Sequence, residues 1–293
     1  DALKKVPGAF INRPKGIAET ANGISMRGFG EDSIQVLYDG MPMNEAYDGS
    51  VNWNAIPVDN VERIEIVRGA ASSLYGGRAV GGVINIITKE PTEKMRVRLG
   101  LNYGTYGTWR KSVSVSQKAS DKVSYEVGYE QRLTSGFTSK VASYTSARGS
   151  KATGTVGTGL IVSQKVSGDP RYIIGDPGNG GGKNNTYHAK VKYNFDKDKS
   201  LTYAFTHDEF RYWSDEPHSY IHDAKGNELF NGSVKAPNGK WINFDESDFT
   251  DYYGRRNTNI HALRYNDEAN KLSANLGVSN VYDAGYSTGY YFD

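Results

Sequence analysis

Polar and apolar residues alternate one by one over most of the chain after residue 95. In RVRLGLNYG (96–104), every second residue from Val97 to Tyr103 is apolar, and KVSYEVGYEQR (122–132) repeats the pattern. Because side chains of a β-strand point to opposite faces in turn, this period of two predicts strands with one apolar and one polar face. Such strands are predicted over 96–104, 111–117, 122–132, 186–195, 200–208, 259–265 and 271–280, and the C-terminal residues leave room for an eighth.

The first 90 residues instead contain short apolar stretches broken by Gly and Pro. QVLYDGMPM (35–43) predicts a strand, a turn at Asp39-Gly40 and a short return strand. Two more strands are predicted over 61–69 and 81–89. The composition changes near Pro91, so we expect two domains, residues 1–92 and residues 93–293.

The predicted strands of the second domain are joined by connections of two kinds. Those at 105–108, 118–121 and 196–199 are short, whereas 133–185 and 211–256 are long and rich in Gly, Asn and Asp. Short turns at one end and long extracellular loops at the other are typical of outer-membrane β-barrels.

A soluble β-sandwich is the alternative, because its strands also alternate. Two observations favour the barrel. Loops of about 45–50 residues are uncommon in compact soluble domains. Tyrosine and phenylalanine also gather at the strand ends, as in an interfacial aromatic girdle, at Tyr103, Tyr129, Tyr193 and Phe195.

Composition narrows the protein class further. The chain of 293 residues has 35 Lys+Arg and 33 Asp+Glu, a net charge of +2 that indicates no nucleic-acid partner. No apolar run approaches the ~20 residues of a membrane-spanning helix. The absence of cysteine excludes a disulfide scaffold, Cys-ligated zinc and thiol catalysis. No G-x-S-x-G, H-E-x-x-H or Walker motif occurs, so we expect no enzyme.

A family resemblance covers nearly all of residues 6–89. The segments VPGAFINR, GISMRGFGEDSIQVLYDGMPMN and IPVDNVERIEIVRGAASSLYGGRAVGGVINIITK closely resemble the plug domain of TonB-dependent outer-membrane receptors. The resemblance implies an all-β membrane barrel of about 22 strands with an N-terminal α+β plug domain inside its lumen. It also implies the bacterial outer membrane as location, its lipids and the energy-coupling protein TonB as partners, and uptake of an iron-siderophore, haem or cobalamin.

Seven or eight strands cannot close around a plug of ~90 residues, because a barrel of that size encloses only side chains or one small ligand. An open barrel would leave strand edges unpaired in lipid, where each unsatisfied backbone group costs several kcal/mol. We therefore expect the chain to be a fragment of a longer receptor, with the TonB-contacting segment before Asp1 and further strands after Asp293. A ligand-sensing receptor with an additional signalling domain, or a soluble adhesin or carbohydrate-binding module, remain alternatives.

The polar lumen of such a barrel requires a polar plug surface. The resemblance places Glu62, Glu65 and Arg68 in a charged cluster that holds the plug to the barrel wall, and an ordinary solvated strand face is the alternative. The structural plug–barrel residues that we expect are Arg27, Glu62, Glu65, Arg68 and Arg78.

Ligand contacts are expected at the plug apices. The segment 43–54 combines flat aromatic rings with amides and an acid, which suits a polar organic ligand. The predicted ligand-binding residues are Asn44, Tyr47, Asp48, Asn52, Trp53, Ser73 and Tyr75. A loop that only packs against the barrel wall is the alternative.

The long loops contain weaker candidates. His218 and His222 have no fixed spacing, so metal or haem ligation is not favoured. No resident cofactor is expected. Clustered carboxylates bind calcium in some relatives, which makes Asp245, Glu246, Asp248 and Asp251 weak calcium candidates, although no EF-hand pattern is present.

Overall fold

The computed structural model describes residues 8–11, 23–45, 49–56, 59, 61–69, 77–250 and 252–287. The chain forms two compact units. The first comprises Asp1–Thr134, Lys183–Arg211 and Arg255–Asp283, and the second comprises Ser135–Gly182, Tyr212–Gly254 and Ala284–Asp293. Within the described residues, no helix is both long and apolar enough to cross a membrane.

The N-terminal part of the first unit, which we call the plug, contains a four-stranded sheet in the order β4-β3-β6-β5. Strand β3 lies parallel to β6, and β5 lies antiparallel to it. The plug elements are β1 (Ala9–Ile11), β2 (Ile24–Met26), η3 (Glu31–Ser33), β3 (Ile34–Tyr38), β4 (Met41–Pro42), η4 (Trp53–Ala55), β5 (Val61–Arg68) and β6 (Gly82–Thr88). Ile34, Val36 and Ile84 are fully buried in its core.

The strands and the turn predicted for the plug are all found. Asp39 and Gly40 both have positive φ, +50° and +78°, as the tight turn of a two-residue hairpin requires. Gly40 also permits a close approach, because a Cβ atom there would lie 2.3 Å from a guanidinium nitrogen of Arg264.

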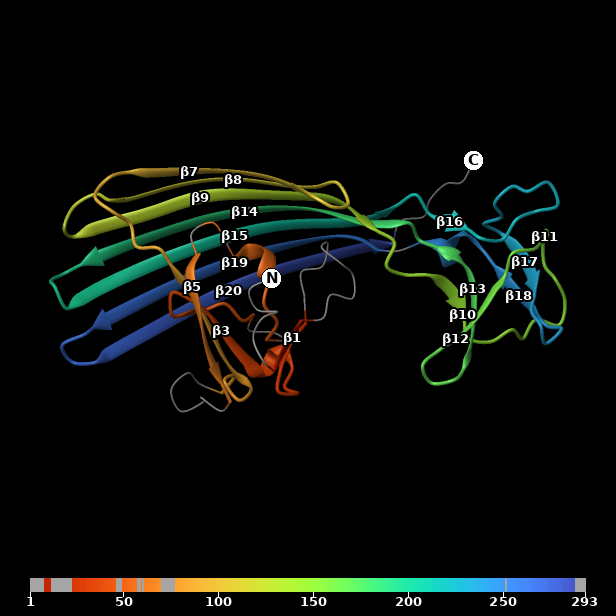
Figure 1. Ribbon diagram of the computed structural model, residues 1–293, viewed down its shortest axis with the longest axis horizontal. Helices are drawn as coiled ribbons and strands as arrows, with labels where there is room; N and C mark the ends of the chain where they lie inside the picture. The colour runs from red at the N-terminus through yellow and green to blue at the C-terminus, as the bar shows by residue number, and fades with distance from the viewer. Residues whose placement is uncertain are drawn as a thin grey trace. The chain divides into compact units, whose positions relative to one another are not determined.

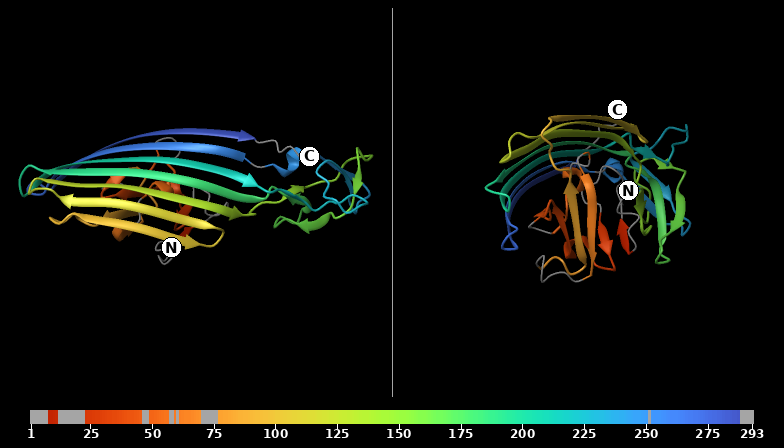
Figure 2. Two further views of the ribbon diagram at one scale, coloured as in Figure 1. Left: turned by 90° about the horizontal axis from the view of Figure 1, so that it is seen from above. Right: turned by 60° about the vertical axis from the view of Figure 1, so that its left-hand side comes forward.

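Seven strands in the order β20-β19-β15-β14-β9-β8-β7 form one sheet, which we call the wall (Figure 1). Each predicted strand of the second domain is present, and most are longer than predicted. They are β7 (Arg96–Gly104), β8 (Thr108–Lys118), β9 (Val123–Phe137), β14 (Asn179–Asn194), β15 (Lys199–Asp215), β19 (Tyr252–Asp267) and β20 (Leu272–Ser287). Figure 2 shows that the wall is curved and that the plug strands lie on its concave side.

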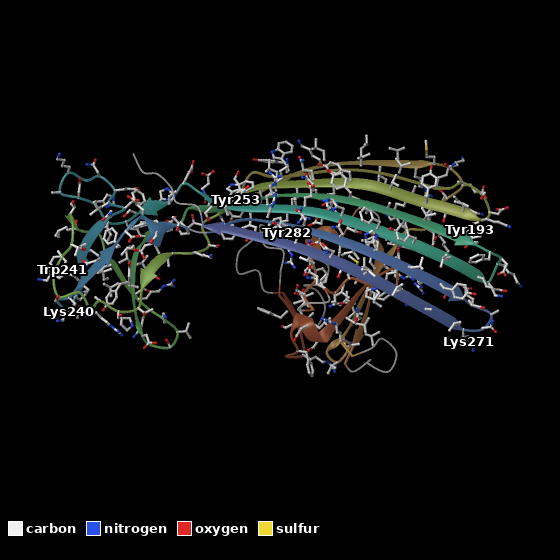
Figure 3. The ribbon with its side chains drawn as sticks, turned by 180° about the vertical axis from the view of Figure 1, so that it is seen from behind. Tyr193, Lys240, Trp241, Tyr253, Lys271 and Tyr282 are labelled. Atoms are coloured by element: carbon white, nitrogen blue, oxygen red, sulfur yellow. The ribbon has the colours of Figure 1, made fainter. Side chains whose placement is uncertain are left out.

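The short turns 119–122, 195–198 and 268–271 gather at one end of the wall. The amide of Asn194 donates to the carbonyl of Lys122 at 2.7 Å, and the amide of Glu268 donates to that of Asp198 at 2.9 Å. In Figure 3, Tyr193 and Lys271 mark this end. The turn 105–107 lies at the opposite end of the strands, because β7 and β8 are antiparallel. The prediction that grouped it with the other short turns is therefore wrong in this detail.

The wall is apolar outside and polar inside. Leu99 on the convex face is 81% exposed, whereas Glu126 on the concave face is 1% exposed. Val97, Val127 and Val191 are also exposed. A β-sandwich would bury these apolar residues in a dry core, so this inverted pattern excludes the sandwich interpretation and fits a membrane barrel.

Aromatic rings pair near both ends of the wall strands. The rings of Tyr103 and Trp109 lie 4.8 Å apart near the turn 105–107, and those of Tyr193 and Phe195 lie 5.1 Å apart near the opposite end. All four side chains are exposed. Of the residues predicted for an aromatic girdle, Tyr103, Tyr193 and Phe195 are therefore exposed near the strand ends, whereas Tyr129 is half-buried and its ring lies 4.9 Å from that of Tyr187.

The two long connections have more structure than loops. They form the second unit, with one sheet of β10 (Ala142–Tyr144), β12 (Ile161–Gln164), β13 (Pro170–Asp176) and β16 (His218–Ser219), and another of β11 (Val156–Gly157), β17 (Gly232–Lys235) and β18 (Trp241–Phe244). The helical turn η5 (Glu246–Phe249) places Phe249 in their shared core. These strands are two to seven residues long, too short for periodicity to identify.

Candidate functional site

The surface between the plug and the wall is the candidate functional site, because it joins the two parts through polar side chains. Three groups of contacts hold it, and we call them the anchor, the arginine network and the clamp. All three lie within the first unit.

The anchor surrounds a fully buried carboxylate of the wall. Asp208 of β15 accepts a hydrogen bond at 2.8 Å from the Nδ2 atom of Asn52, in the plug. Its other oxygen accepts hydrogen bonds at 2.7 Å from both Asn184 and Thr186 of β14. A buried charge is tolerated only when it is well paired, and here a plug residue supplies one of the donors.

The arginine network lies over strands β8 and β9. The Nη2 atom of Arg110 donates to Asp59 of the plug at 2.7 Å, and Arg110 also makes a two-pronged contact with Glu130 at 2.8 Å. Arg132 donates to the side-chain oxygen of Asn54 at 2.7 Å. Burial raises the pKa of the Asp59 carboxyl, but the hydrogen bonds from Ser112 and Arg110 outweigh it, so the pKa is lowered from its usual value.

The clamp holds the tight turn between β3 and β4. The Nζ atom of Lys190 donates to the Asp39 carboxylate at 2.7 Å and to Thr88 at 2.6 Å. Arg264 of β19 donates to the backbone carbonyl of Asp39 at 2.6 Å. Two cations from two wall strands therefore hold a turn of two residues.

A cavity of about 230 Å³ lies beside the clamp. Its lining includes Asp39, Lys190, Lys192, Thr202, Arg264 and Glu268. Because Glu268 belongs to the turn 268–271, the cavity lies toward the end of the wall that carries the short turns. The charged lining indicates a space suited to water and polar solutes rather than to a lipid chain.

The structure places the predicted apex residues as follows. All the amide capacity of Asn44 is used inside the plug, because it accepts from the amide of Val36 at 2.8 Å and donates to the carbonyls of Ile34 and Gly49. The indole of Trp53 donates to Glu31 at 2.5 Å. Asn52 belongs to the anchor, as the wall-packing alternative expects. Ligand binding by this segment stays a prediction, and Tyr47, Asp48, Ser73 and Tyr75 lie outside the described residues.

The predicted plug–barrel charges make different contacts. Glu62 and Glu65 pair with Arg63 on β5, at 3.7 and 2.8 Å. Arg27 and Arg68 are exposed. The guanidinium of Arg78 packs over Gly49, where a Cβ atom would lie 2.1 Å from it. Their role in holding the plug to the barrel stays a prediction.

Among the described plug residues whose side chains make polar contacts with the wall, only Asn52 was predicted as a site residue. Further residues with such contacts are Asp39, Glu45, Asn54, Asp59 and Thr88, of which Glu45 pairs with Arg256 of β19. The sequence pattern does indicate one of their partners. Lys190, which contacts Asp39 and Thr88, lies on the polar side of a strand that the alternation predicts.

The acidic residues of the second unit cap a helical turn. Asp245 accepts from the amide of Ser247 at 2.9 Å, and Asp248 accepts from the amide of Asp245 at 3.0 Å, which forms a capping box around η5. Glu246 lies in its first turn, and Asp251 is not among the described residues. Over the part of the chain that the structure describes, no three His, Cys, Asp or Glu side chains are grouped to hold a metal. Calcium binding stays a weak prediction.

Comparisons with known proteins point to one family. The family model for the TonB-dependent Receptor Plug Domain matches residues 1–83. The Vitamin B12 transporter BtuB of Vibrio cholerae is 39% identical over 105 residues, which cover 36% of this chain and 17% of that protein. The Ferric enterobactin receptor PirA of Pseudomonas aeruginosa is 33% identical over 108 residues, or 33% of this chain and 15% of that protein.

Solved structures match nearly the whole chain. The ferric enterobactin receptor PfeA superposes on 97% of this chain and 38% of its own length, with a TM-score of 0.57 and 18% identity. The ferric yersiniabactin uptake receptor FyuA of Yersinia pestis gives a TM-score of 0.56 at 17% identity, over 97% of this chain and 38% of its own. The fold is therefore shared, and this chain spans well under two thirds of the proteins that it matches.

Proposed function

We propose that this chain, which belongs to the TonB-dependent outer-membrane receptors, serves the active uptake of a scarce ligand across the bacterial outer membrane. One observation carries the proposal: a separate plug is bound by polar contacts to the concave, polar face of a sheet whose convex face is apolar. A wide barrel needs a plug to prevent leakage, and polar contacts can be replaced by water when the plug moves.

The domain division supports this arrangement. Strand β6 ends at Thr88 and β7 begins at Arg96, so the chain leaves the plug and enters the wall within a few residues. We therefore propose residues 1–92 as the plug domain and residues 93–293 as barrel. In this family TonB couples the proton gradient of the inner membrane to plug movement, and we propose TonB as the partner. The proposed activity is transport, and no chemical step is assigned to the chain.

The ligand class is proposed at the level that the relatives support. Vitamin B12 appears in the name of one relative, and ferric siderophores appear in those of others. The charged and amide-rich inner surface of the wall suits a polar ligand of either kind. We accordingly propose an iron-siderophore or cobalamin as the transported molecule, and haem remains a candidate from the family resemblance of the sequence alone.

An uptake assay tests this function. The full-length receptor is expressed in cells that lack their own receptors, and growth is measured on a panel of ferric siderophores, haem and cyanocobalamin as sole iron or vitamin source. We expect growth on one ligand, abolished by deletion of TonB and by a protonophore. Growth on none of the panel, or equal growth without TonB, would contradict the proposal.

A further inference from the structure

The clamp and the anchor both attach the plug to strand β14, but at different positions along it. On β14, Thr186 of the anchor precedes Lys190 of the clamp by four residues, which is roughly 13 Å at about 3.3 Å per strand residue. On β15, anchor residue Asp208 lies six residues, or roughly 20 Å, from Thr202 in the cavity lining. The two contacts can therefore break independently.

Their environments make the clamp the easier contact to break. The side chains of Asp39 and Lys190 are 19% and 16% exposed, and both line the cavity, so water can reach the ion pair. Asp208 is fully buried, and loss of Asn52 would remove the donor to one of its two carboxylate oxygens, Oδ2, while Asn184 and Thr186 still donate to the other. Hydrating a partly exposed pair is much less costly than uncovering a buried charge.

The surface above the clamp is mainly apolar, and Ile260 of β19 packs there into the plug core. Ala204 and Ala262 of the wall face Met41 and Met43 of the plug around a void of about 20 Å³. Methionine side chains adapt to irregular gaps. This stretch can therefore separate once the clamp is released.

We infer that the transported ligand leaves between the plug and strands β14, β15 and β19, through the cavity beside the clamp, and that Lys190 and Arg264 are the positioning residues that close this route. The inference rests on the proposed transport function. In outer-membrane barrels the short turns face the periplasm, so the cavity beside these turns is the exit side. Asp39 of the turn, held by the two cations, lines this cavity.

A labelling experiment in cells tests this route without the ligand. Because this chain has no cysteine, Ala262→Cys introduces one thiol above the clamp, and Ser116→Cys introduces a control thiol on β8. The two positions are similarly buried, at 4% and 3% exposure. The full-length receptor is treated with a small charged maleimide that reaches the periplasm through porins, and the unsubstituted receptor gives the background.

We expect energised cells to label Ala262→Cys faster than cells treated with a protonophore. Adding Lys190→Met should raise the labelling rate of Ala262→Cys in de-energised cells about two- to fivefold, as expected for the loss of one partly exposed ion pair. Lys190→Arg should restore the low rate. Lys192→Met removes a charge from the same cavity without touching the clamp, and it should leave the rate unchanged. Ser116→Cys should label slowly throughout.

Three outcomes would overturn the route: no increase with Lys190→Met, an equal increase with Lys192→Met, or an equal increase at Ser116→Cys. Failure of the proposed transport function would give a different labelling pattern from failure of this route. If Lys190→Met raises labelling of Ala262→Cys but no variant responds to the proton gradient, the clamp controls access and active uptake is contradicted. If energy-dependent labelling occurs at Ser116→Cys instead, plug movement stands and this route is overturned.

Discussion

Asp208 illustrates how single residues hold the plug in place. Its carboxylate lies on an inward position of β15 and accepts hydrogen bonds from two wall residues, Asn184 and Thr186, and from Asn52 of the plug. A buried acceptor that loses its donor keeps the full cost of its desolvation. The plug and the wall therefore stabilise each other through groups that neither could bury alone.

Replacement of Asn52 should measure that dependence. We expect Asn52→Leu to lower the free energy of unfolding of the detergent-purified receptor by about 1–3 kcal/mol, because Asp208 loses a donor that water cannot replace. Asn227→Leu is the matched control, since that amide is exposed and its partner Asp223 stays hydrated. Urea unfolding compares the two. Equal effects of both substitutions would contradict the anchor.

Asp59 should give the plug contact a pH dependence. Because the folded pKa is lowered below the unfolded value of about 3.9, its contribution to stability is present above that pH and is lost as the pH falls through the folded pKa. The melting temperature is measured by thermal unfolding from pH 7 to pH 3. At neutral pH the wild type should melt at a higher temperature than Asp59→Asn, and this difference should shrink as the pH falls. Asp121→Asn alters only an exposed ion pair and should show little difference at any pH. A difference in melting temperature that persists at pH 3 would contradict the proposed contribution of the ionised Asp59 carboxylate.

At the scale of elements, the alternation of polar and apolar residues is inverted relative to a soluble sheet, because the apolar side chains of the wall lie on its exposed face. In β7 to β9 the apolar residues face outward and the serines and glutamates face the plug. The backbone pairs strand to strand in register from Arg96↔Ser116 to Gly104↔Thr108. The inner strands of the wall therefore satisfy their backbone through neighbours on both sides, and they leave one face for lipid and one for the lumen.

A charge on the lipid face should block assembly of the wall. We expect Leu99→Arg to cost about 2–4 kcal/mol near the middle of the bilayer and to reduce the folded, heat-modifiable form of the receptor in outer membranes. Val166→Arg places the same charge on a fully exposed residue of the second unit, between β12 and β13, and should assemble normally. Equal assembly of both variants would show that Leu99 does not face lipid.

On the scale of the whole molecule, the plug and the wall differ in what they need from each other. The wall exposes its apolar face whether or not the plug is present, and its inner charges can be hydrated by lumen water. The plug has a core of Ile34, Val36 and Ile84, to which the wall adds one buried side chain, Ile260 of β19. The polar contacts between them therefore position the plug more than they create either fold.

Deletion of residues 1–92 tests this independence. We expect the remaining receptor to assemble in the outer membrane and to admit hydrophilic antibiotics too large for general porins, because water can hydrate the uncovered inner face. The sensitivity of the cells to these antibiotics is measured by growth inhibition, and cells with the full-length receptor are the control. Failure of the shortened receptor to assemble would indicate that the wall requires the plug for folding.

Local pattern was enough to place the wall strands and the Asp39-Gly40 turn, since alternation and turn chemistry involve neighbouring residues. It was not enough for the short strands of the second unit, whose pairing depends on the partner segment. The predicted apex segment shows the same limit. Its amides and aromatic rings suit a ligand, and only the fold revealed that Asn52 meets Asp208, 156 residues away.

Sequence alone therefore determined which wall residues face outward and which family motifs the plug carries, because each of these is written in short stretches of chain. The tertiary structure decided which plug residues meet the wall and where the cavity lies. Those contacts join residues as distant as Asp39 and Arg264, 225 positions apart. The physical reason is that charged residues on a polar strand face can pair with many partners, and only the seating of the plug against the curved wall selects among them.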